Sequence, residues 1–350
     1  MPLDISQLHT HPLAERENKV RLDQFSLPPA TGDDRLPDPL TLLPDILIGH
    51  DFPAFVRAVA RARRAGRPFV LMVGGHVIKT GLSRLVIDLM RRGIVTHLAG
   101  NGSVSIHDYE IALIGETSED VATYLPDGRF GNWEETCRDL NEAVNRGADD
   151  GLGYGAAVGR YIAERDLPHA DASVFAQAWR LGIPFTVHVA FGNDIIHQHP
   201  TWDPARTGMA TGHDFRLFTD AVAEMEGGAL MNLGSAVILP ETFLKALSVA
   251  RNLQNGKPET FTTGVFDMAT PYRSAMNVAQ RPTASGGADA HGYVFTGHHE
   301  ILFPLFYYAL RREMAAPIAP KAHDRNGSGS TPAAALAAAA SSGRNGVGGN

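Results

Sequence analysis

Hydrophobic positions between residues 41 and 314 follow two alternating patterns. Short apolar runs that end in glycine, such as PFVLMVGG and IVTHLAGNG, are typical of buried parallel strands. Between them lie segments of helical periodicity, including SRLVIDLMRRG, which we expect to end at Gly93. Because parallel strands need crossover connections, the alternation predicts an α/β fold whose parallel sheet carries helices on both faces.

The same alternation continues to the last apolar segment. Further strands are expected in IPFTVHVA, GALMNLGSAVI and TFTTGVFDM, and helices around HDYEIALIG, near 155–165, in SVFAQAWRLG, in PETFLKALSVARNL and near HEILFPLFYYALRR. The polar stretch near 117–150 shows no clear periodicity, so we expect it to be irregular.

Composition separates the chain into three zones. Residues 1–40 are polar and interrupted by prolines, which predicts an extended N-terminal arm. Residues 41–314 form one expected α/β domain, and residues 315–350 are rich in Ala, Gly and Ser, which indicates a low-complexity, disordered tail.

Overall composition excludes several classes of protein. Hydrophobic residues make up 44% of the 350 positions, enough for a substantial core. The single cysteine, Cys137, can form neither an internal disulfide nor a cysteine-rich zinc site, which suits the cytoplasm. No apolar run approaches the ~20 residues that span a bilayer. The net charge of −7 argues against non-specific nucleic-acid binding, although a local basic patch remains possible.

Two glycine-containing loops follow the first two predicted strands. The first contains Gly74, Gly75, His76, Lys79 and Thr80, and it precedes a helix. Glycines let a backbone approach a phosphate closely, and a helix N-terminus supplies free N–H groups. The loop matches neither a Walker A motif nor the spaced GxGxxG fingerprint, so a plain structural turn is an equal alternative.

The second loop contains Gly100, Asn101, Gly102 and Ser103. His107, Asp108 and Glu110 follow it closely. Because the carboxyl ends of parallel strands share one sheet edge, we expect the two loops to converge there. His107 is a candidate proton carrier; the two carboxylates could instead cap a helix N-terminus.

A third polar cluster follows the strand that ends near Ala190. It contains Asn193, Asp194, His197 and His199. Together with His298, His299 and Glu300, these histidines could form a metal site, although their spacing matches no strong zinc signature. We favour a polar substrate pocket in which Asp194 pairs with an ammonium group.

Other candidates lie near the ends of later predicted strands. They are Gly234 with Ser235, Asp267, and Gly297 with His298. Asp267 could accept hydrogen bonds from ribose hydroxyls or be a solvated loop carboxylate. Ser285, Gly286 and Gly287 form either a flexible loop over the pocket or a surface turn.

The order of these motifs resembles the deoxyhypusine synthase-like group from about Ile46 to Arg312. The segments that carry the resemblance are GGHVIKTGLSRLVIDLMRRGIVTHLAGNGSVSIHDYE, SVFAQAWRLGIPFTVHVAFGND, LMNLGSAVI and HEILFPLFYYAL. The resemblance implies a Rossmann-like NAD-binding fold and a homo-oligomer, either a dimer or a tetramer.

The resemblance also implies which residues contact the cofactor NAD. These are Gly75, His76, Lys79 and Thr80 in the first loop, Gly100, Asn101 and Gly102 in the second, Gly234 and Ser235 in the third, and Asp267, Gly297 and His298 near the adenosine end. Gly74 and Ser103, which border the first two loops, are added as cofactor-binding candidates. Asp194 falls where the family has acidic residues that face nicotinamide or a substrate ammonium.

Two departures argue against deoxyhypusine synthesis itself. The family forms an imine on an active-site lysine, but this chain has no lysine between Lys257 and Lys321. The family histidine after the third glycine loop is also missing, because Leu239, Pro240 and Glu241 stand there.

A second pattern is similar to NAD-dependent ornithine cyclodeaminase domains. Gly100, Asn101, His107, Asp108 and Glu110 carry that similarity. Both families use NAD to oxidise a carbon next to nitrogen transiently, which makes that carbon electrophilic. We therefore expect an NAD-dependent transferase or lyase acting on an amine or amino acid, with His107, Asp108 and Asp194 as catalytic residues. An ornithine cyclodeaminase-type ammonia lyase, a metal-assisted hydrolase and a non-catalytic cofactor-binding protein remain alternatives.

Overall fold

A computed structural model describes residues 9, 12, 22–26 and 39–315. The chain divides into two compact units, residues 1–54 and 55–350, and the boundary falls inside helix α1 (Ile48–Arg64). In the first unit the described residues form the short 3-10 helices η3 (Leu22–Gln24) and η4 (Pro39–Leu42) and the first turns of α1. Most of the predicted arm, and the predicted tail after Ala315, lie outside the described residues.

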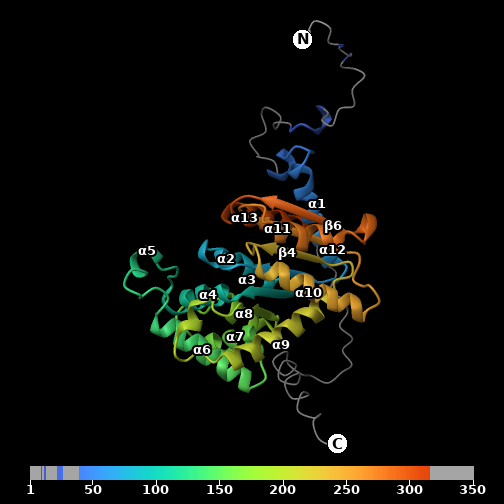
Figure 1. The fold of residues 1–350 in the computed structure, drawn as a ribbon. Helices are drawn as coiled ribbons and strands as arrows, with labels where there is room; N and C mark the ends of the chain where they lie inside the picture. Colours follow the sequence, from blue (N-terminus) through green and yellow to red (C-terminus); the bar gives the residue numbers. More distant parts are fainter. Residues whose placement is uncertain (1–8, 10–11, 13–21, 27–38, 316–350) are drawn as a thin grey trace, which may run out of the picture. The chain divides into compact units, whose positions relative to one another are not determined.

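Six parallel strands form the sheet of the second unit, as Figure 1 shows. They are β1 (Phe69–Val73), β2 (His97–Asn101), β3 (Phe185–His188), β4 (Ala229–Leu233), β5 (Thr262–Asp267) and β6 (His291–Thr296). Their spatial order is β3-β2-β1-β4-β5-β6, and every neighbouring pair is parallel. This order is that of the doubly wound nucleotide-binding folds, so the predicted fold class is confirmed.

Helices connect the strands and cover both sheet faces. They are α2 (Gly75–Lys79), α3 (Ser83–Arg91), α4 (Gly102–Ile114), α5 (Val121–Tyr124), α6 (Glu134–Asp149), α7 (Tyr154–Glu164), α8 (Val174–Leu181), α9 (Pro204–Ala223), α10 (Ile238–Leu253), α11 (Tyr272–Ser274), α12 (Arg281–Thr283) and α13 (His299–Glu313), with 3-10 turns η5 (Ile195–Gln198) and η7 (Gly287–Asp289) and the π-helix η6 (Ala275–Gln280). Within the described ranges, none of the helices has the length and apolar character needed to cross a membrane.

The two faces of the sheet carry different helices. On one face Phe218 of α9, Phe243 of α10 and Val278 of η6 join strand residues such as Val265 in one buried cluster. On the other face the ring of Phe55 in α1 packs 5.6 Å from Phe266 of β5 and 5.7 Å from Phe306 of α13. Neighbouring strand residues therefore point to opposite, buried faces, as the continuous apolar runs predict.

One predicted segment is wrong. The stretch near 117–150 was expected to be irregular, but its second half forms α6. The sequence EETCRDLNEAVNRGAD buries Cys137, Leu140, Ala143 and Val144, which recur at helical spacing. Frequent charged residues on the exposed side hide this apolar stripe in the composition. The helix expected around HDYEIALIG also begins earlier, at Gly102, because α4 follows directly after β2.

Candidate functional site

The carboxyl ends of β1 and β4 lie side by side at the centre of the sheet. Strand order reverses at this pair, and ligands of open α/β sheets bind at such a switch point. The first and third predicted loops, at Gly74 and Gly234, follow these two strands. A Cβ atom added to Gly74 would lie only 2.0 Å from the carbonyl oxygen of Gly234. The two loops therefore touch, and a side chain at position 74 would disrupt that contact.

The second loop packs against the first. Asn101 is the N-cap of α4, and its side-chain oxygen accepts a 2.9 Å hydrogen bond from the Ser103 hydroxyl. A Cβ atom on Gly75 would lie 2.5 Å from Ser103 Oγ and 3.1 Å from a ring carbon of His107. The expected convergence of the glycine loops at one sheet edge is thus present in the structure.

Side chains of the protein itself lie against several of these glycines. Asp194 approaches Gly102 so closely that an added Cβ would lie 2.0 Å from Asp194 Oδ2. The His299 ring covers Gly234 in the same way, at 2.9 Å from an added Cβ, and Gly234 has a positive φ of 71°. These glycines therefore also have a structural role, because they make room for polar side chains at the sheet edge.

Asp194 stands at the start of η5, after β3. It forms a capping box in which its carboxylate accepts from the His197 backbone, while its own N–H lies 3.3 Å from His197 Nδ1. Its second oxygen, Oδ2, is buried and has no hydrogen-bond partner among the described residues. Burial raises the pKa of Asp194 to about 6. A buried carboxylate with an unused oxygen is suited to receive a cationic group.

His107 forms a hydrogen-bonded chain with Thr117 and Glu110. His107 Nδ1 lies 2.8 Å from Thr117 Oγ1, and that hydroxyl donates to Glu110 Oε2 at 2.5 Å. Because the threonine has a single hydroxyl proton, Nδ1 must carry the proton of the imidazole, which leaves Nε2 as an acceptor. Burial, with smaller effects of Lys79 and His76, lowers the pKa of His107 to about 4. His107 is therefore neutral at neutral pH, and its Nε2 has a lone pair that can accept a hydrogen bond.

Asp108 faces away from His107. It is fully buried, and its carboxylate accepts hydrogen bonds from Ser173 Oγ and from the backbone N–H groups of Val174 and Phe175. These donors form the N-terminus of α8, so Asp108 ties α4 to that helix. Burial nevertheless raises its pKa to about 6.

Residues at the β4–β6 side of the edge form a second polar group. Asp267 ends β5 and has one buried oxygen, Oδ2, without a partner among the described residues. His299 is buried, with Nε2 3.8 Å from Asp267 Oδ1, and its ring centre lies 5.3 Å from that of His76. His298, the predicted contact, is exposed instead. Only the sequence pair HH signalled His299, and the pattern could not tell which histidine faces inward.

The remaining predicted residues line the same edge in less distinctive ways. Lys79 is exposed, and Thr80 Oγ1 donates to the carbonyl of His76. Ser235 Oγ accepts from the Leu239 N–H at 3.3 Å, and the Gly297 N–H donates to the Asp267 carbonyl at 2.9 Å. Gly100, the fourth residue of β2, is buried beneath the Phe185 ring.

The histidines of the metal alternative do not come together. His197 and His199 follow β3, whereas His298 and His299 follow β6, and these strands form opposite edges of the sheet. Five strand spacings of about 4.8 Å separate them. Within the described part of the chain, no group of three or more His, Cys, Asp or Glu side chains is arranged to hold a metal ion.

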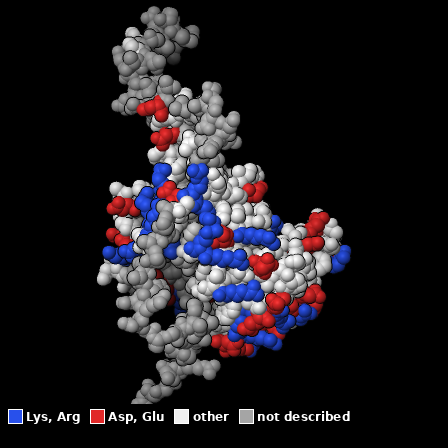
Figure 2. Space-filling view, turned by 180° about the vertical axis from the view of Figure 1, so that it is seen from behind, with Lys and Arg blue, Asp and Glu red and all other residues white. Residues whose placement is uncertain are grey.

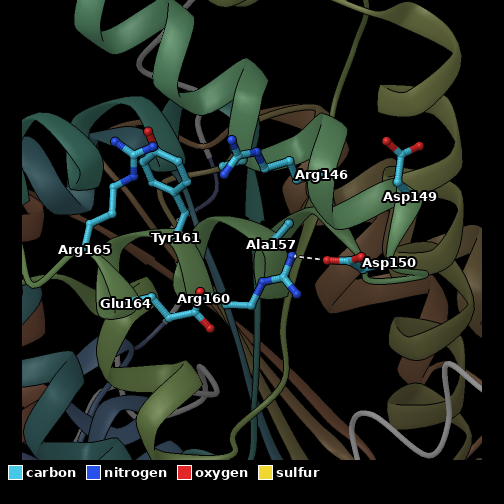
Figure 3. A pocket seen from close by; sticks show the side chains of 9 residues that line it. Arg146, Asp149, Asp150, Ala157, Arg160, Tyr161, Glu164 and Arg165 are labelled. Atoms are coloured by element: carbon cyan, nitrogen blue, oxygen red, sulfur yellow. Dashed lines mark hydrogen bonds and ion pairs between the residues drawn. The ribbon is translucent and has the colours of Figure 1, made fainter.

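A cavity of about 770 Å³ lies between the end of α4 and the segment 116–136. Its wall contains Thr117 and Glu110 of the hydrogen-bonded chain, the rings of Tyr124 and Trp133, and further acidic side chains. A second cavity, of about 580 Å³, lies between α6 and α7 and is drawn in Figure 3. Its arginines are paired with carboxylates, for example Arg160 with Asp150 at 2.6 Å, so none of them is left to attract an anionic ligand.

Comparison with known proteins identifies similar folds only. No protein-family model matches the sequence, and no curated protein matches it significantly. Among solved structures, AgrE in a ternary complex with ornithine and NAD⁺ has a TM-score of 0.50 and 14% identity, covering 76% of this chain and 33% of that chain. A proposed LOR/SDH protein from Methanococcus maripaludis S2 has a TM-score of 0.47 and 13% identity over 75% of this chain and 69% of that one.

A proposed deoxyhypusine synthase from Entamoeba histolytica has a TM-score of 0.45 and 10% identity over 75% of this chain and 87% of that one. ArgZ, an arginine dihydrolase from cyanobacteria, has a TM-score of 0.45 and 14% identity over 76% of this chain. The present chain spans about a third of the length of ArgZ and AgrE. At 14% identity, the likeness to AgrE shows a similar fold alone.

Proposed function

We propose that this chain is an NAD-dependent enzyme that acts on an amine or amino acid through transient oxidation of the carbon next to nitrogen. The observation that carries the proposal is the pair of touching loops at Gly74 and Gly234, flanked by two buried carboxylates, Asp194 and Asp267, with one unused oxygen each. Such loops at a switch point suit a pyrophosphate, and the unused oxygens suit hydroxyl or ammonium donors.

The residues around the switch point fit a dinucleotide. The backbone at Gly74, Gly75, Gly234 and Ser235 would hold the pyrophosphate, and Asp267 the hydroxyls of one ribose. His76, Lys79 and Thr80 would border the first loop, Gly100, Asn101, Gly102 and Ser103 the second, and Gly297 and His298 the adenosine side. The buried, unpartnered Oδ2 of Asp267 supports this assignment, because buried polar atoms normally have a partner.

The chain's own residues would bind the amine and remove its proton. Bound NAD supplies a hydride acceptor. Asp194 binds the substrate ammonium through Oδ2, and Nε2 of His107 accepts a proton from the substrate nitrogen as the neighbouring carbon is oxidised. The Thr117–Glu110 chain keeps the proton on Nδ1 and orients the ring. We give Asp108 a positioning role, because three donors already occupy its carboxylate.

The net reaction is either group transfer or ammonia release. Both begin with the same oxidation, and no lysine of the described active-site edge other than the exposed Lys79 is available for a covalent imine. Release of ammonia, as in an ornithine cyclodeaminase-type lyase, needs only water or an internal nucleophile. We place the enzyme in a homo-oligomer on the strength of the sequence resemblance alone.

Two measurements test this proposal. Mass spectrometry of small molecules released from gently denatured protein should detect NAD, and a titration with NAD⁺ should saturate at one equivalent per chain. Ornithine, arginine and a panel of diamines are then assayed for ammonia release and for transient absorbance of reduced cofactor. Binding without turnover on any amine would favour a non-catalytic cofactor-binding protein, and the absence of NAD binding would overturn the proposal.

A further inference from the structure

Arginines are concentrated on one face of the second unit, remote from the candidate site. The segments 55–67, 83–93 and 306–313 contain ten arginines, no lysine and two acidic residues. We call these arginines the basic face: Arg57, Arg61, Arg63, Arg64, Arg67, Arg84, Arg91, Arg92, Arg311 and Arg312. Figure 2 shows blue side chains gathered on the side of the molecule seen there. Ten of the 31 Lys and Arg residues of a chain with a net charge of −7 thus lie on one surface.

Contacts between α1, α3 and α13 make the basic face continuous. Arg64 of α1 pairs with Glu313 of α13 at 3.2 Å, and Asp88 of α3 pairs with Arg311 of α13 at 2.8 Å. Arg63 donates to the carbonyl of Gly93, just after α3, at 2.9 Å. The C-terminal ends of all three helices therefore meet. Because α1 and α3 lead into β1 and β2, the basic face lies toward the amino ends of the strands.

Six of these ten arginines, Arg312 not among them, have no ion-pair partner among the described residues. Within the three segments the carboxylates are Asp88 and Glu313, which pair with Arg64, Arg92 and Arg311. Arg57, Arg61, Arg67 and Arg84 are exposed and have no ion-pair partner among the described residues.

Helix dipoles explain only part of the pattern. Cations stabilise the last turn of a helix, which accounts for six of the ten arginines: Arg61, Arg63, Arg64, Arg91, Arg311 and Arg312. Arg84, however, lies in the first turn of α3, where a cation is unfavourable. Arg57 and Arg61 stand four residues apart on α1, where like charges repel each other. These positions suggest that the charges face an external anion.

We propose that the basic face binds the phosphate backbone of a nucleic acid without reading its sequence. Arginine presents a planar fork that matches phosphate oxygens, and clustered arginines on one face are typical of such surfaces. A protein partner or a membrane would need exposed apolar anchors between the charges. Among the described residues of these three segments, Tyr308 is the single large hydrophobic side chain that is exposed. This distribution of charge revises the expectation, drawn from the net charge alone, that the chain does not bind nucleic acid non-specifically.

Fluorescence anisotropy with the full chain and a labelled DNA duplex of about 20 base pairs and arbitrary sequence tests this proposal. Phosphate contacts make binding depend on salt, so between about 50 and 200 mM salt the slope of log K against log [salt] should be about −3 to −4 for four contacts. The triple variant R57Q/R61Q/R84Q should bind the duplex at least about tenfold more weakly than the wild type. The magnitude of its salt slope should be smaller by about two to three. None of the three positions belongs to the candidate site.

A second triple variant controls for net charge. R129Q/R146Q/R216Q removes the same charge from exposed arginines elsewhere and should bind like the wild type. The proposal is overturned if the wild type does not bind the duplex at the lowest salt, or if both triple variants lose the same affinity. It is equally overturned if an acidic peptide or vesicles of anionic lipid bind this face and the duplex does not.

Discussion

Asp194 combines three properties that rarely occur together in one carboxylate. It is buried, its Oδ2 has no partner among the described residues, and its backbone is fixed by the capping box with His197. Burial raises its pKa to about 6, so the charged form is available only above that pH. The pH dependence of amine binding, compared between the wild type and an Asp194 variant, can therefore report on this residue.

We expect amine affinity to fall as the pH falls through about 6, because protonated Asp194 no longer attracts an ammonium group. Below the pKa the apparent KM should rise about tenfold per pH unit. Asp194→Asn should raise KM at least tenfold at pH 8, and its KM should no longer rise as the pH falls below about 6. Steady-state kinetics between pH 5 and 8 checks this, and Asp127→Asn, at an exposed carboxylate, serves as the control. If KM of Asp194→Asn still rose at low pH as in the wild type, Asp194 would not be the group that binds the substrate ammonium.

His107 should affect the chemical step more than substrate binding. Replacement with Gln removes the basic nitrogen and should lower kcat by about 10² to 10⁴ while NAD affinity stays within about twofold. Thr117→Val removes only the partner of Nδ1, so we expect a smaller loss. Steady-state kinetics combined with an NAD⁺ titration measures both effects. Equal kcat in His107→Gln and wild type would contradict a role as base.

Asp108 illustrates how a helix can be held by a residue of another helix. Replacing it with Ala leaves the Ser173 hydroxyl and two backbone N–H groups of α8 without their acceptor, in a fully buried place. We expect a loss of about 3 kcal/mol in the free energy of unfolding. Asp120→Ala removes the exposed N-cap of α5 and should cost about 1 kcal/mol or less. Denaturant titrations of both variants decide whether Asp108 is structural; full stability with lost turnover would restore a catalytic role.

A pair of buried histidines links β2 and β3. His97 Nε2 and His188 Nε2 each lie 3.2 Å from Thr186 Oγ1, whose hydroxyl donates to the Leu98 carbonyl. Both rings must therefore donate to the threonine oxygen and remain neutral. Burial lowers the pKa of each to about 3, with His188 adding to the shift of His97.

This pair should make the fold sensitive to acid. Unfolded histidines bind a proton below about pH 6.5 and the folded ones do not, so stability falls as the pH decreases from about 6.5 toward 3. Each histidine contributes a slope of about 1.4 kcal/mol per pH unit. His188→Gln should reduce the pH dependence of the free energy of unfolding by about 1.4 kcal/mol per pH unit. His291→Gln, at an exposed position, should leave this pH dependence unchanged. The free energy of unfolding measured between pH 4 and 7 checks this; equal slopes in all three proteins would contradict it.

The repeating pattern of apolar runs was sufficient to predict β1 to β5 and the helices α3, α7, α8, α10 and α13. It gave no residue range for β6, whose sequence HGYVFT is largely exposed or half-buried. It also missed α1, α6 and α9, where charged or small residues obscure the apolar stripe. Signals based on burial fail where an element is only partly buried.

The candidate site was predictable to the extent that loops after parallel strands must share an edge. Long-range contacts were not predictable: nothing in the sequence indicates that Asp108 bonds Ser173, 65 positions away, or that His299 rather than His298 turns inward. Such partners are determined by the packing of whole helices. The sequence could therefore name the polar residues at the edge but not divide them into binding and structural groups.

At the scale of the whole molecule, occupation of the switch point should stabilise the entire sheet. Its loops leave from β1 and β4, the two central strands, so a ligand that binds only the folded chain raises the free energy of unfolding of the complete α/β unit. At a NAD⁺ concentration of about 100 Kd the gain is about 2.7 kcal/mol, which should raise Tm by several degrees for a domain of this size. Differential scanning calorimetry with and without NAD⁺ measures the shift.

Asp267→Asn distinguishes specific from general stabilisation. The variant should have a smaller shift at the same NAD⁺ concentration, because an amide donates as well as accepts and fits the ribose diol less well. Asp289→Asn, in the exposed turn η7, should keep the full shift. If NAD⁺ raises the Tm of the wild type and of both variants equally, the stabilisation does not arise at the carboxyl end of β5. The proposed orientation of the dinucleotide across β1, β4 and β5 would then be wrong.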